Sequence, residues 1–322
     1  MSAPPARPRP EWRTVDGILL LDKPEGLSSN QALQRVRRLY RARKGGHTGS
    51  LDPLASGVLP LCFGEATKVA GLLLDADKSY RATLALGART ASGDREGEVV
   101  ERAPVPALDA ATVETALRRF RGAGTQVPPM YSALKRDGEA LYALARRGVV
   151  VERAPRPVRI EALRLVGLAP GALEIEVTCS KGTYVRTLGE DIARALGTVG
   201  HLAALRRTAV GGALARHAVH PLAALEGLAG DERALDALLL PVDAALADVP
   251  ALHLGAGAAA RFRHGQTVAA AAPAAARVRL YGPDGTFLGL GEADVAGAAV
   301  RPLRLMSEPD GVPSAAGAPT VT

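Results

Sequence analysis

One acidic residue, Asp52, stands in a glycine- and proline-rich loop that follows a run of arginines. Pro53 restricts Asp52 to extended backbone conformations, and Gly49 and Gly57 allow tight turning or close approach on either side. A carboxylate held in this way could act as a nucleophile or as a base. Because Asp-Pro pairs also cap helical turns, Asp52 alone could equally be an ordinary capping residue.

Metal and disulfide chemistry are not indicated. His47 has no second His, Cys or acidic residue at the spacing of metal ligands. The only cysteines, Cys62 and Cys179, lie far apart and form no CxxC pattern, which predicts neither a zinc site nor a disulfide framework. We expect a protein of a reducing cytoplasm.

The composition and charge of the chain indicate which class of molecule it binds. The chain of 322 residues is 47% hydrophobic but only 3% aromatic, so alanine, leucine and valine must build most of the core. A net charge of +7 and a pI near 9.7 favour a polyanion such as nucleic acid, although alanine- and arginine-rich chains also arise from genomic composition. No apolar stretch approaches the ~20 residues that span a bilayer, so no membrane association is expected.

The Asp52 loop resembles the motif of a known family. Residues 46–64 contain GHTGSLDPLASGVLP, which is similar to the catalytic loop of the bacterial tRNA pseudouridine synthases of the TruB family. The resemblance covers about residues 15–306 and is most specific at 46–64 and 179–187. It implies an isomerase that detaches uracil from ribose at N1 and reattaches it through C5, at uridine 55 in the T-arm of tRNA. No metal or organic cofactor is implied, because the reaction consumes nothing.

The resemblance assigns three catalytic residues. Asp52 would be the carboxylate that acts on the target nucleoside. Arg186 would pair with it, since an ionised acid in a dry pocket is costly without a cation nearby. Tyr80 would stack on the target base and take part in proton handling at C5. Without the resemblance, a surface arginine at a strand end and a core tyrosine would be the simpler interpretations.

Four further residues would bind or support the substrate. His47 would belong to the surface that holds the target loop with its base flipped out. Tyr184 would line the site, and Lys23 would support it from beneath. Leu205 would lie near the bound base, although plain core packing explains a leucine there almost as well.

The elements that must position these residues begin with an apolar run over 17–22, which predicts a buried strand ending in a turn before Pro24. Polar residues 28–30 could cap a helix over about 31–43. Residues 31–44 contain six basic and no acidic side chains. A solvated helix face normally mixes both signs, so this segment favours contact with RNA phosphates.

The remaining pattern mixes helices and strands without regular βαβ alternation. Helices are expected over 65–74, 109–121, 138–147, 191–196, 202–207 and 222–246, and strands over 79–86, 158–166, 173–179, 182–187, 278–281 and 286–292. We therefore predict an α+β fold with a central, mostly antiparallel mixed sheet flanked by helices, which is the pseudouridine synthase fold that the resemblance implies.

We predict two domains, a catalytic domain over 13–249 and a small β-rich domain over 250–306, separated by a seam at 248–250. The tails, 1–12 and 307–322, are rich in Pro, Ala, Gly and Ser and are expected to be disordered.

Two parts of these domains would contact RNA. Residues of about 122–150 form a predicted inserted arm with exposed Arg146 and Arg147. The second domain resembles a PUA domain, an RNA-binding module, through residues 262–268 and the hairpin that ends at Glu292.

The sequence leaves three alternative functions to consider. A guide-RNA-dependent synthase of the dyskerin type is less favoured than a stand-alone monomer, because such proteins often carry lysine-rich extensions and this chain ends in an apolar tail. An RNA-folding chaperone would need only the basic helix and the PUA-like domain. A glycosidase-like hydrolase would release free uracil, but O-glycoside hydrolysis usually uses two carboxylates, and the matched segments offer only Asp52.

Overall fold

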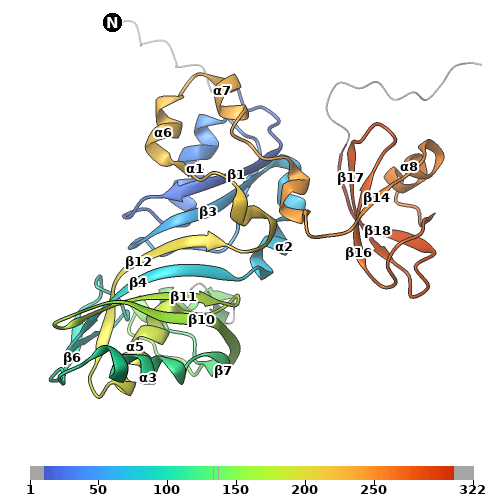
Figure 1. The fold of residues 1–322 in the computed structure, drawn as a ribbon. Helices are drawn as coiled ribbons and strands as arrows, with labels where there is room; N and C mark the ends of the chain where they lie inside the picture. The colour runs from blue at the N-terminus through green and yellow to red at the C-terminus, as the bar shows by residue number, and fades with distance from the viewer. Residues whose placement is uncertain (1–10, 133, 137, 308–322) are drawn as a thin grey trace, which may run out of the picture. The chain divides into compact units, whose positions relative to one another are not determined.

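The computed structural model describes residues 11–132, 134–136 and 138–307 (Figure 1). Contacts divide the chain into two compact units, of which the first ends at Leu240 and the second begins at Pro241. This division precedes the predicted seam at 248–250, because the hydroxyl of Tyr281 donates a hydrogen bond of 2.6 Å to Asp243 within the second unit. The predicted disordered tails lie almost wholly outside the described residues.

A nine-stranded mixed sheet forms the framework of the first unit (Figure 1). Its strand order is β13-β1-β3-β12-β4-β11-β10-β7, and β2 pairs with β3. Most neighbours are antiparallel, whereas β12 with β3 and β1 with β13 are parallel, which confirms the predicted mixed sheet. The strands are β1 (Gly17–Lys23), β2 (Gly45–His47), β3 (Ala55–Phe63), β4 (Lys78–Leu86), β7 (Gly122–Gln126), β10 (Arg156–Ala169), β11 (Ala172–Cys179), β12 (Gly200–Val210) and β13 (His220–Pro221).

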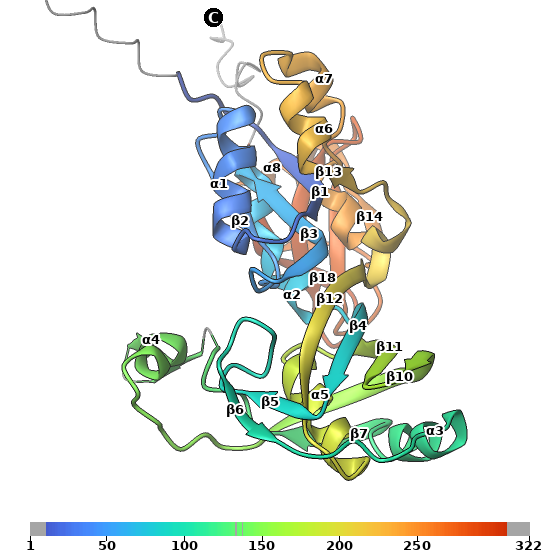
Figure 2. The same cartoon turned by 90° about the vertical axis from the view of Figure 1, so that its left-hand side faces the viewer.

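Helices and two short hairpins surround this sheet. The hairpins pair β5 (Ala88–Thr90) with β6 (Val99–Arg102), and β8 (Lys135–Arg136) with β9 (Glu139–Ala140). Figure 2 shows α4 standing apart from the sheet, at the predicted arm. The helices are α1 (Ser29–Leu39), α2 (Ala70–Asp75), α3 (Ala110–Arg118), α4 (Leu141–Arg146), α5 (Val185–Ala195), α6 (Leu222–Gly227) and α7 (Glu232–Asp236), with 3-10 turns η1 (Gly64–Lys68) and η2 (Gly212–Arg216).

Two predicted elements have the wrong type. Residues 202–207 are part of strand β12 and not a helix. A β-bulge between Leu202 and Ala204 inserts one residue, so the buried Leu202 and Leu205 are three residues apart, a spacing that imitates a helix. Residues 182–187 are not a strand but lead into α5. Their alternating β-branched residues suggested a strand, but the buried face of Val185, Leu188 and Ile192 has helical spacing.

Several other elements begin or end at residues different from the predicted ones. The helix predicted over 31–43 ends at Leu39, and Arg41 adopts a positive φ of 49°. The helix predicted over 65–74 is split into η1 and α2. The helix predicted over 222–246 is broken into α6, α7 and η3 (Val242–Leu246), since Gly230 has a φ of +93° and Pro241 precedes η3. Within 46–64, residues 48–54 and Gly64, the first residue of η1, lie outside strands.

The second unit has its own small core. Its five-stranded sheet has the order β14-β16-β17-β18-β15, and Phe262 of the helix is fully buried in the apolar cluster. The predicted strands at 278–281 and 286–292 are confirmed. The elements are β14 (Ala251–His253), α8 (Ala256–Arg263), β15 (Val268–Ala269), β16 (Arg277–Tyr281), β17 (Phe287–Ala293) and β18 (Ala299–Leu305).

Tyr40 joins helix α1 to the core and to α7. Its ring stacks on Phe63 with a centroid distance of 5.2 Å, and its hydroxyl donates a hydrogen bond of 2.7 Å to the carbonyl of Leu235. The side chain is completely buried, so water cannot replace this bond.

We predict that Tyr40→Phe lowers the free energy of unfolding by about 0.5–1.5 kcal/mol, because one buried hydrogen bond is lost while the carbonyl of Leu235 keeps the N–H of Leu238 as a donor. The matched variant Tyr142→Phe removes a hydroxyl from a residue that is 45% exposed, and should change stability by less than about 0.5 kcal/mol. Urea unfolding of both variants checks this, and equal losses would contradict it.

Candidate active site

The loop that carries Asp52 is fixed by its backbone. The buried hydroxyl of Ser29 accepts a hydrogen bond of 2.7 Å from the Leu51 N–H and lies 3.0 Å from the Leu51 carbonyl, to which it can donate. On the other side of Asp52, the carbonyl of Pro53 accepts a bond of 2.8 Å from the N–H of Gly26. Both flanks of the carboxylate are therefore held, while its own side chain is 43% exposed.

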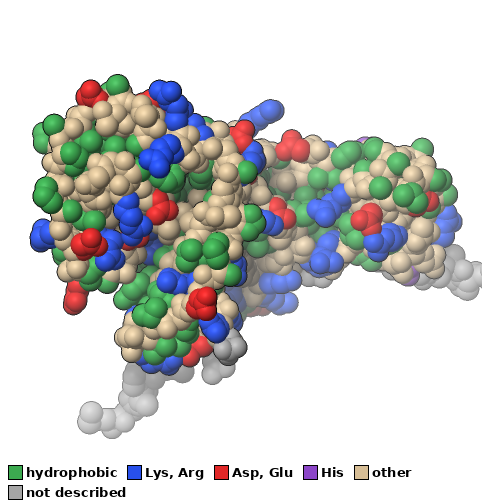
Figure 3. Space-filling model, turned by 90° about the horizontal axis from the view of Figure 1, so that it is seen from below, with side chains coloured by type: hydrophobic (Ala, Val, Ile, Leu, Met, Phe, Trp, Pro, Cys, Tyr) green, Lys and Arg blue, Asp and Glu red, His purple; other side chains and the backbone are tan. Residues whose placement is uncertain are grey.

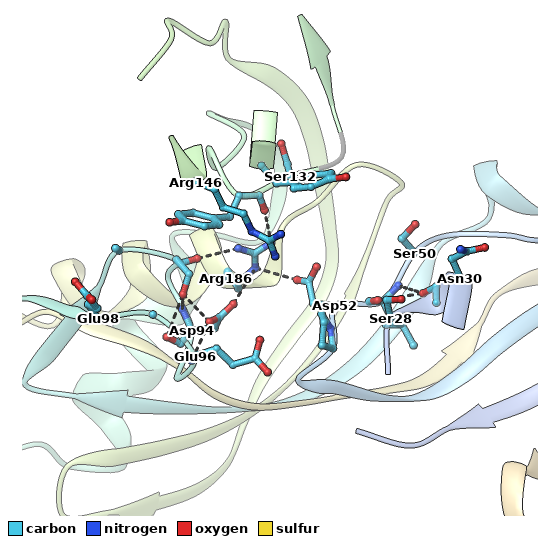
Figure 4. A pocket seen from close by; sticks show the side chains of 18 of the residues that line it. Ser28, Asn30, Ser50, Asp52, Asp94, Glu96, Glu98, Ser132, Arg146 and Arg186 are labelled. Carbon is cyan, nitrogen blue, oxygen red and sulfur yellow. Dashed lines mark hydrogen bonds and ion pairs between the residues drawn. The ribbon is translucent and has the colours of Figure 1, made fainter. Parts of the chain in front are cut away.

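Arg186 is the cationic partner of Asp52. Its Nε lies 3.0 Å from Asp52 Oδ2 (Figure 4). The guanidinium is 6% exposed and also donates to the carbonyls of Ser92, at 2.8 Å, and Tyr131, at 2.6 Å. Since a planar guanidinium with three fixed acceptors has little freedom, Arg186 orients the Asp52 carboxylate. The predicted pairing of these two side chains is present in the structure.

A second acid, Asp94, was missed by sequence reasoning. Its Oδ2 lies 3.7 Å from Arg186 Nε, and its side chain is 7% exposed. Ser92 donates its hydroxyl to Asp94 Oδ1 at 2.6 Å, and the Glu96 N–H donates to the same oxygen at 3.1 Å. Figure 4 shows Arg186 between Asp52 and Asp94. A Ser-Gly-Asp turn has the composition of any loop, so no sequence signal distinguished it.

A cleft of about 770 Å³ opens over this pair. Its size lies within the range of pockets that bind small molecules, and a flipped nucleoside is of that class. Tyr131, Ser132, Tyr142 and Arg146 come from the predicted arm and line the cleft, and Figure 4 labels Ser132 and Arg146 among them. The remaining lining residues are Ser28, Ser29, Asn30, His47, Ser50, Leu51, Asp52, Pro53, Ala91, Ser92, Asp94, Glu96, Gly97, Glu98 and Arg186.

Of the predicted substrate-binding residues, only His47 lines this cleft. Its ring is half-buried, and its Nδ1 makes no hydrogen bond within the described part of the protein. Burial lowers the pKa of His47, and the nearby Arg207 guanidinium lowers it further. A neutral imidazole with a free nitrogen can donate to or accept from a polar ligand.

Tyr184, Leu205 and Lys23 are not among the residues that line the cleft. The backbone N–H and carbonyl of Tyr184 both bond to the buried side chain of Gln126, at 2.7 and 3.1 Å. Leu205 belongs to the main apolar core, which agrees with the simpler interpretation of that residue. Lys23 is completely buried and donates from Nζ to the carbonyls of Pro24 and Leu27, at 2.8 and 2.7 Å. This arrangement makes Lys23 a support of the segment before α1.

Tyr80 lies on β4 and is partly buried against the core. Burial raises the pKa of its hydroxyl, an effect that the guanidinium of Arg207 opposes and the charge of Asp52 reinforces. The sequence did not single out Arg207, because its segment was predicted as a helix and the adjacent Arg206 is also basic.

The basic segment around α1 is partly neutralised within the protein. Arg35 lies 3.9 Å from Glu226, and Arg41 pairs with Glu232. Arg37 donates to the carbonyls of Ala42 and Arg43. Figure 3, which views the protein from below Figure 1, also shows Lys and Arg side chains with acidic side chains among them. The two acidic partners, Glu226 of α6 and Glu232 of α7, are distant from this segment in sequence, so the composition of residues 31–44 alone could not reveal them.

Within the described ranges, no cluster of His, Cys, Asp and Glu could hold a metal ion. Across the same residues, the helices are too short or too polar to cross a membrane.

Two solved structures share the fold of this chain. One, from the crystal structure of a Cbf5-Nop10-Gar1 complex, has a TM-score of 0.68 and 22% identity, covering 93% of this chain and 91% of the matched chain. The other, an H/ACA RNP bound to a substrate RNA containing 2′-deoxyuridine, has a TM-score of 0.69 and 21% identity, covering 91% and 86%. The architecture is therefore the pseudouridine synthase fold.

Sequence comparison gives the family. The family model described as TruB family pseudouridylate synthase (N terminal domain) matches residues 37–185, and the models tRNA pseudouridylate synthase B C-terminal domain and Pseudouridine synthase II TruB, C-terminal match 186–247 and 250–306. A relative from Burkholderia mallei (strain ATCC 23344), called tRNA pseudouridine synthase B, is 56% identical over 294 residues, which are 89% of this chain and 93% of the relative. One of that name from Hydrogenovibrio crunogenus is 49% identical over 305 residues, 92% and 96% of the two chains. The chain belongs to the TruB family of pseudouridine synthases.

The buried lysine behind the site should couple folding to pH. Burial lowers the pKa of Lys23 from 10.5 to about 8, and Asp52 opposes this shift. Between these values the unfolded chain holds a proton that the folded protein lacks, so this group makes the free energy of unfolding rise with pH. The cost of burying the ammonium is fully present below pH 8 and is relieved toward pH 10.5.

We predict that Lys23→Met removes this contribution. The difference in thermal midpoint between wild type and variant should shift in favour of wild type as the pH rises from 8 toward 10.5, the window of the Lys23 pKa. Lys181→Met, which changes an exposed lysine, is the control. Parallel pH profiles for wild type and Lys23→Met would contradict the prediction.

Proposed function

We propose that the protein converts uridine 55 in the T-arm of tRNA to pseudouridine, with Asp52 as the catalytic carboxylate. The observation that carries this proposal is the ion pair of Asp52 and Arg186 at the cleft, in which the acid is 43% exposed and the cation is 6% exposed. Such a pair holds the carboxylate beside a cation and leaves it accessible to a nucleoside.

The chain's own residues supply the requirements of the isomerisation. Asp52 acts as nucleophile or base on the target nucleoside, while Arg186 fixes its orientation. Tyr80 stacks on the base and handles the proton at C5. The arm residues that line the cleft help to exclude water, so that the detached uracil is retained until it is reattached.

Transfer RNA is the proposed substrate because the relatives are called tRNA pseudouridine synthase B. The net positive charge of +7 also favours binding to a polyanion. Phosphate contacts would make binding salt-dependent, and the extruded base would be recognised in the cleft. The second unit is proposed as a PUA-like module that adds RNA contacts. We propose a cytoplasmic enzyme that works as a monomer without a protein partner or cofactor.

Relatives at 49% and 56% identity favour this activity over the guide-RNA-dependent one, because the likeness to the Cbf5 complex at 22% identity shows only the fold. A role restricted to RNA folding would not require a carboxylate oriented by a buried arginine. A hydrolase would release free uracil, which chromatography of the reaction products detects.

We predict that Asp52→Asn abolishes pseudouridine formation, with a loss of about 10⁴-fold or more. The isosteric amide lacks the charge needed as nucleophile or base. Binding of tRNA should stay within about threefold of wild type, since affinity comes mainly from phosphate contacts. The measurement uses unmodified tRNA, no added cofactor, and chemical mapping of pseudouridine.

The exposed variant Asp75→Asn serves as the matched control and should keep full activity. Retained turnover in Asp52→Asn would refute the role of Asp52. Absence of pseudouridine at position 55 with wild-type protein would refute the proposed substrate site.

A further inference from the structure

Arg207 is a buried cation that the proposed mechanism has not yet used. Only 1% of its surface is exposed, and no carboxylate of the described residues forms an ion pair with it. A buried charge without an anionic partner is costly for folding. A cation kept at that cost next to an active site favours a functional explanation.

The strand pairing places Arg207 between two site elements. It lies on β12, where it pairs with Gly57 of β3 on one side and with Tyr80 of β4 on the other. Strand β3 continues directly from the loop that carries Asp52. Arg207 therefore stands at the point where the Asp52 loop and the Tyr80 strand meet.

Its guanidinium holds both ends of the Asp52 loop. Nε donates a hydrogen bond of 2.6 Å to the carbonyl of Val58, and Nη2 donates one of 2.9 Å to the carbonyl of Gly49. These residues lie on opposite sides of Asp52 in the sequence. Because the guanidinium is planar, the two bonds fix the span of the loop with one rigid group.

The same side chain lies beside Tyr80, because Arg207 of β12 and Tyr80 of β4 are paired across the two strands. Burial raises the pKa of Tyr80, and Arg207 opposes that rise. The charged or titratable groups that face Tyr80 are Arg207 of β12, Cys179 of β11 and Asp52 of the loop.

We propose that Arg207 is a positioning residue that sets the Asp52 loop and the Tyr80 hydroxyl in one fixed relation. The inference rests on the proposed catalytic roles of Asp52 and Tyr80. Arg207 forms no ion pair with a carboxylate of the described residues, and it acts through the carbonyls of Gly49 and Val58 and through its place beside Tyr80.

The kinetic test compares Arg207→Met and Arg207→Lys with Arg206→Met. Arg206 is the adjacent residue, but its side chain is 50% exposed and pairs with Asp22. Arg207→Met should lower the single-turnover rate of pseudouridine formation by about 100-fold, the typical cost of a misplaced catalytic group. The Kd for tRNA should change less than about threefold, because no phosphate contact is lost. Arg206→Met should keep the wild-type rate.

Arg207→Lys separates charge from geometry. An ammonium retains the positive charge but not the planar fork that reaches both carbonyls. We expect it to fold and to lower the single-turnover rate by about tenfold. A wild-type rate in this variant would overturn the inference, even if Arg207→Met failed to fold.

A spectroscopic readout tests the effect of the Arg207 charge on Tyr80 independently of activity. In protein labelled with 3-fluorotyrosine, the ¹⁹F resonance of residue 80 is assigned by its loss in Tyr80→Phe. Removal of the cation in Arg207→Met should move the titration of this resonance to higher pH, whereas Arg207→Lys and Arg206→Met should leave it near its original position. An unchanged titration in Arg207→Met would overturn the proposed relation between Arg207 and Tyr80.

These readouts distinguish the two proposals. If wild-type protein forms no pseudouridine at position 55, the proposed function fails, and the ¹⁹F titration still decides whether Arg207 controls the Tyr80 hydroxyl. If wild type is active and Arg207→Met keeps its rate within about threefold, the positioning role is wrong while the proposed function stands.

A glycine pair supplies a second test from the loop side. Gly49 and Gly171 have nearly equal φ angles, +70° and +72°, a region that an alanine adopts at a similar cost at either position. A Cβ at Gly49 would lie 3.3 Å from Arg207 Nη1, whereas a Cβ at Gly171 meets no heavy atom within 4 Å. We predict that both alanine variants lose similar stability, and that only Gly49→Ala lowers the single-turnover rate, by about tenfold. Equal rates would contradict the coupling.

Discussion

The ion pair of Asp52 with Arg186 is the interaction on which the site depends. A carboxylate with the proposed role must stay accessible, yet it must be held in one direction. The structure meets both needs by burying the cation and leaving the acid half-exposed. Arg186 is in turn held by two backbone carbonyls and by Asp94, so the orientation of the acid depends on segments far from it in sequence.

A second constraint is the central position of β12 in the sheet. This strand pairs in parallel with β3 and antiparallel with β4, and so connects the Asp52 loop to the strand of Tyr80. Gly57 is needed at the same point, because a Cβ there would lie 2.1 Å from the carbonyl oxygen of Arg207. The close approach of β3 to β12 thus depends on the absence of a side chain, and a residue whose role looked like loop flexibility has a packing role as well.

Sequence reasoning succeeded where the signal was local. The apolar run of β1, the alternation of β4 and the turn residues of the C-terminal hairpin each predicted the correct element. It failed at β12, where a bulge altered the period, and at the start of α5, where β-branched residues imitated a strand. Asp94 and Arg207 could not be selected, since their importance comes from contacts between segments that only the folded sheet brings together.

The hydrogen bond from Arg186 to the carbonyl of Tyr131 ties the arm to the charge pair. Any displacement of that backbone to make room for a bulky polymer takes an acceptor from the guanidinium, which then has more donor capacity for Asp52 and for the incoming molecule. The position of the arm and the orientation of the acid are thus linked through one guanidinium, so that a change in either bears on the other.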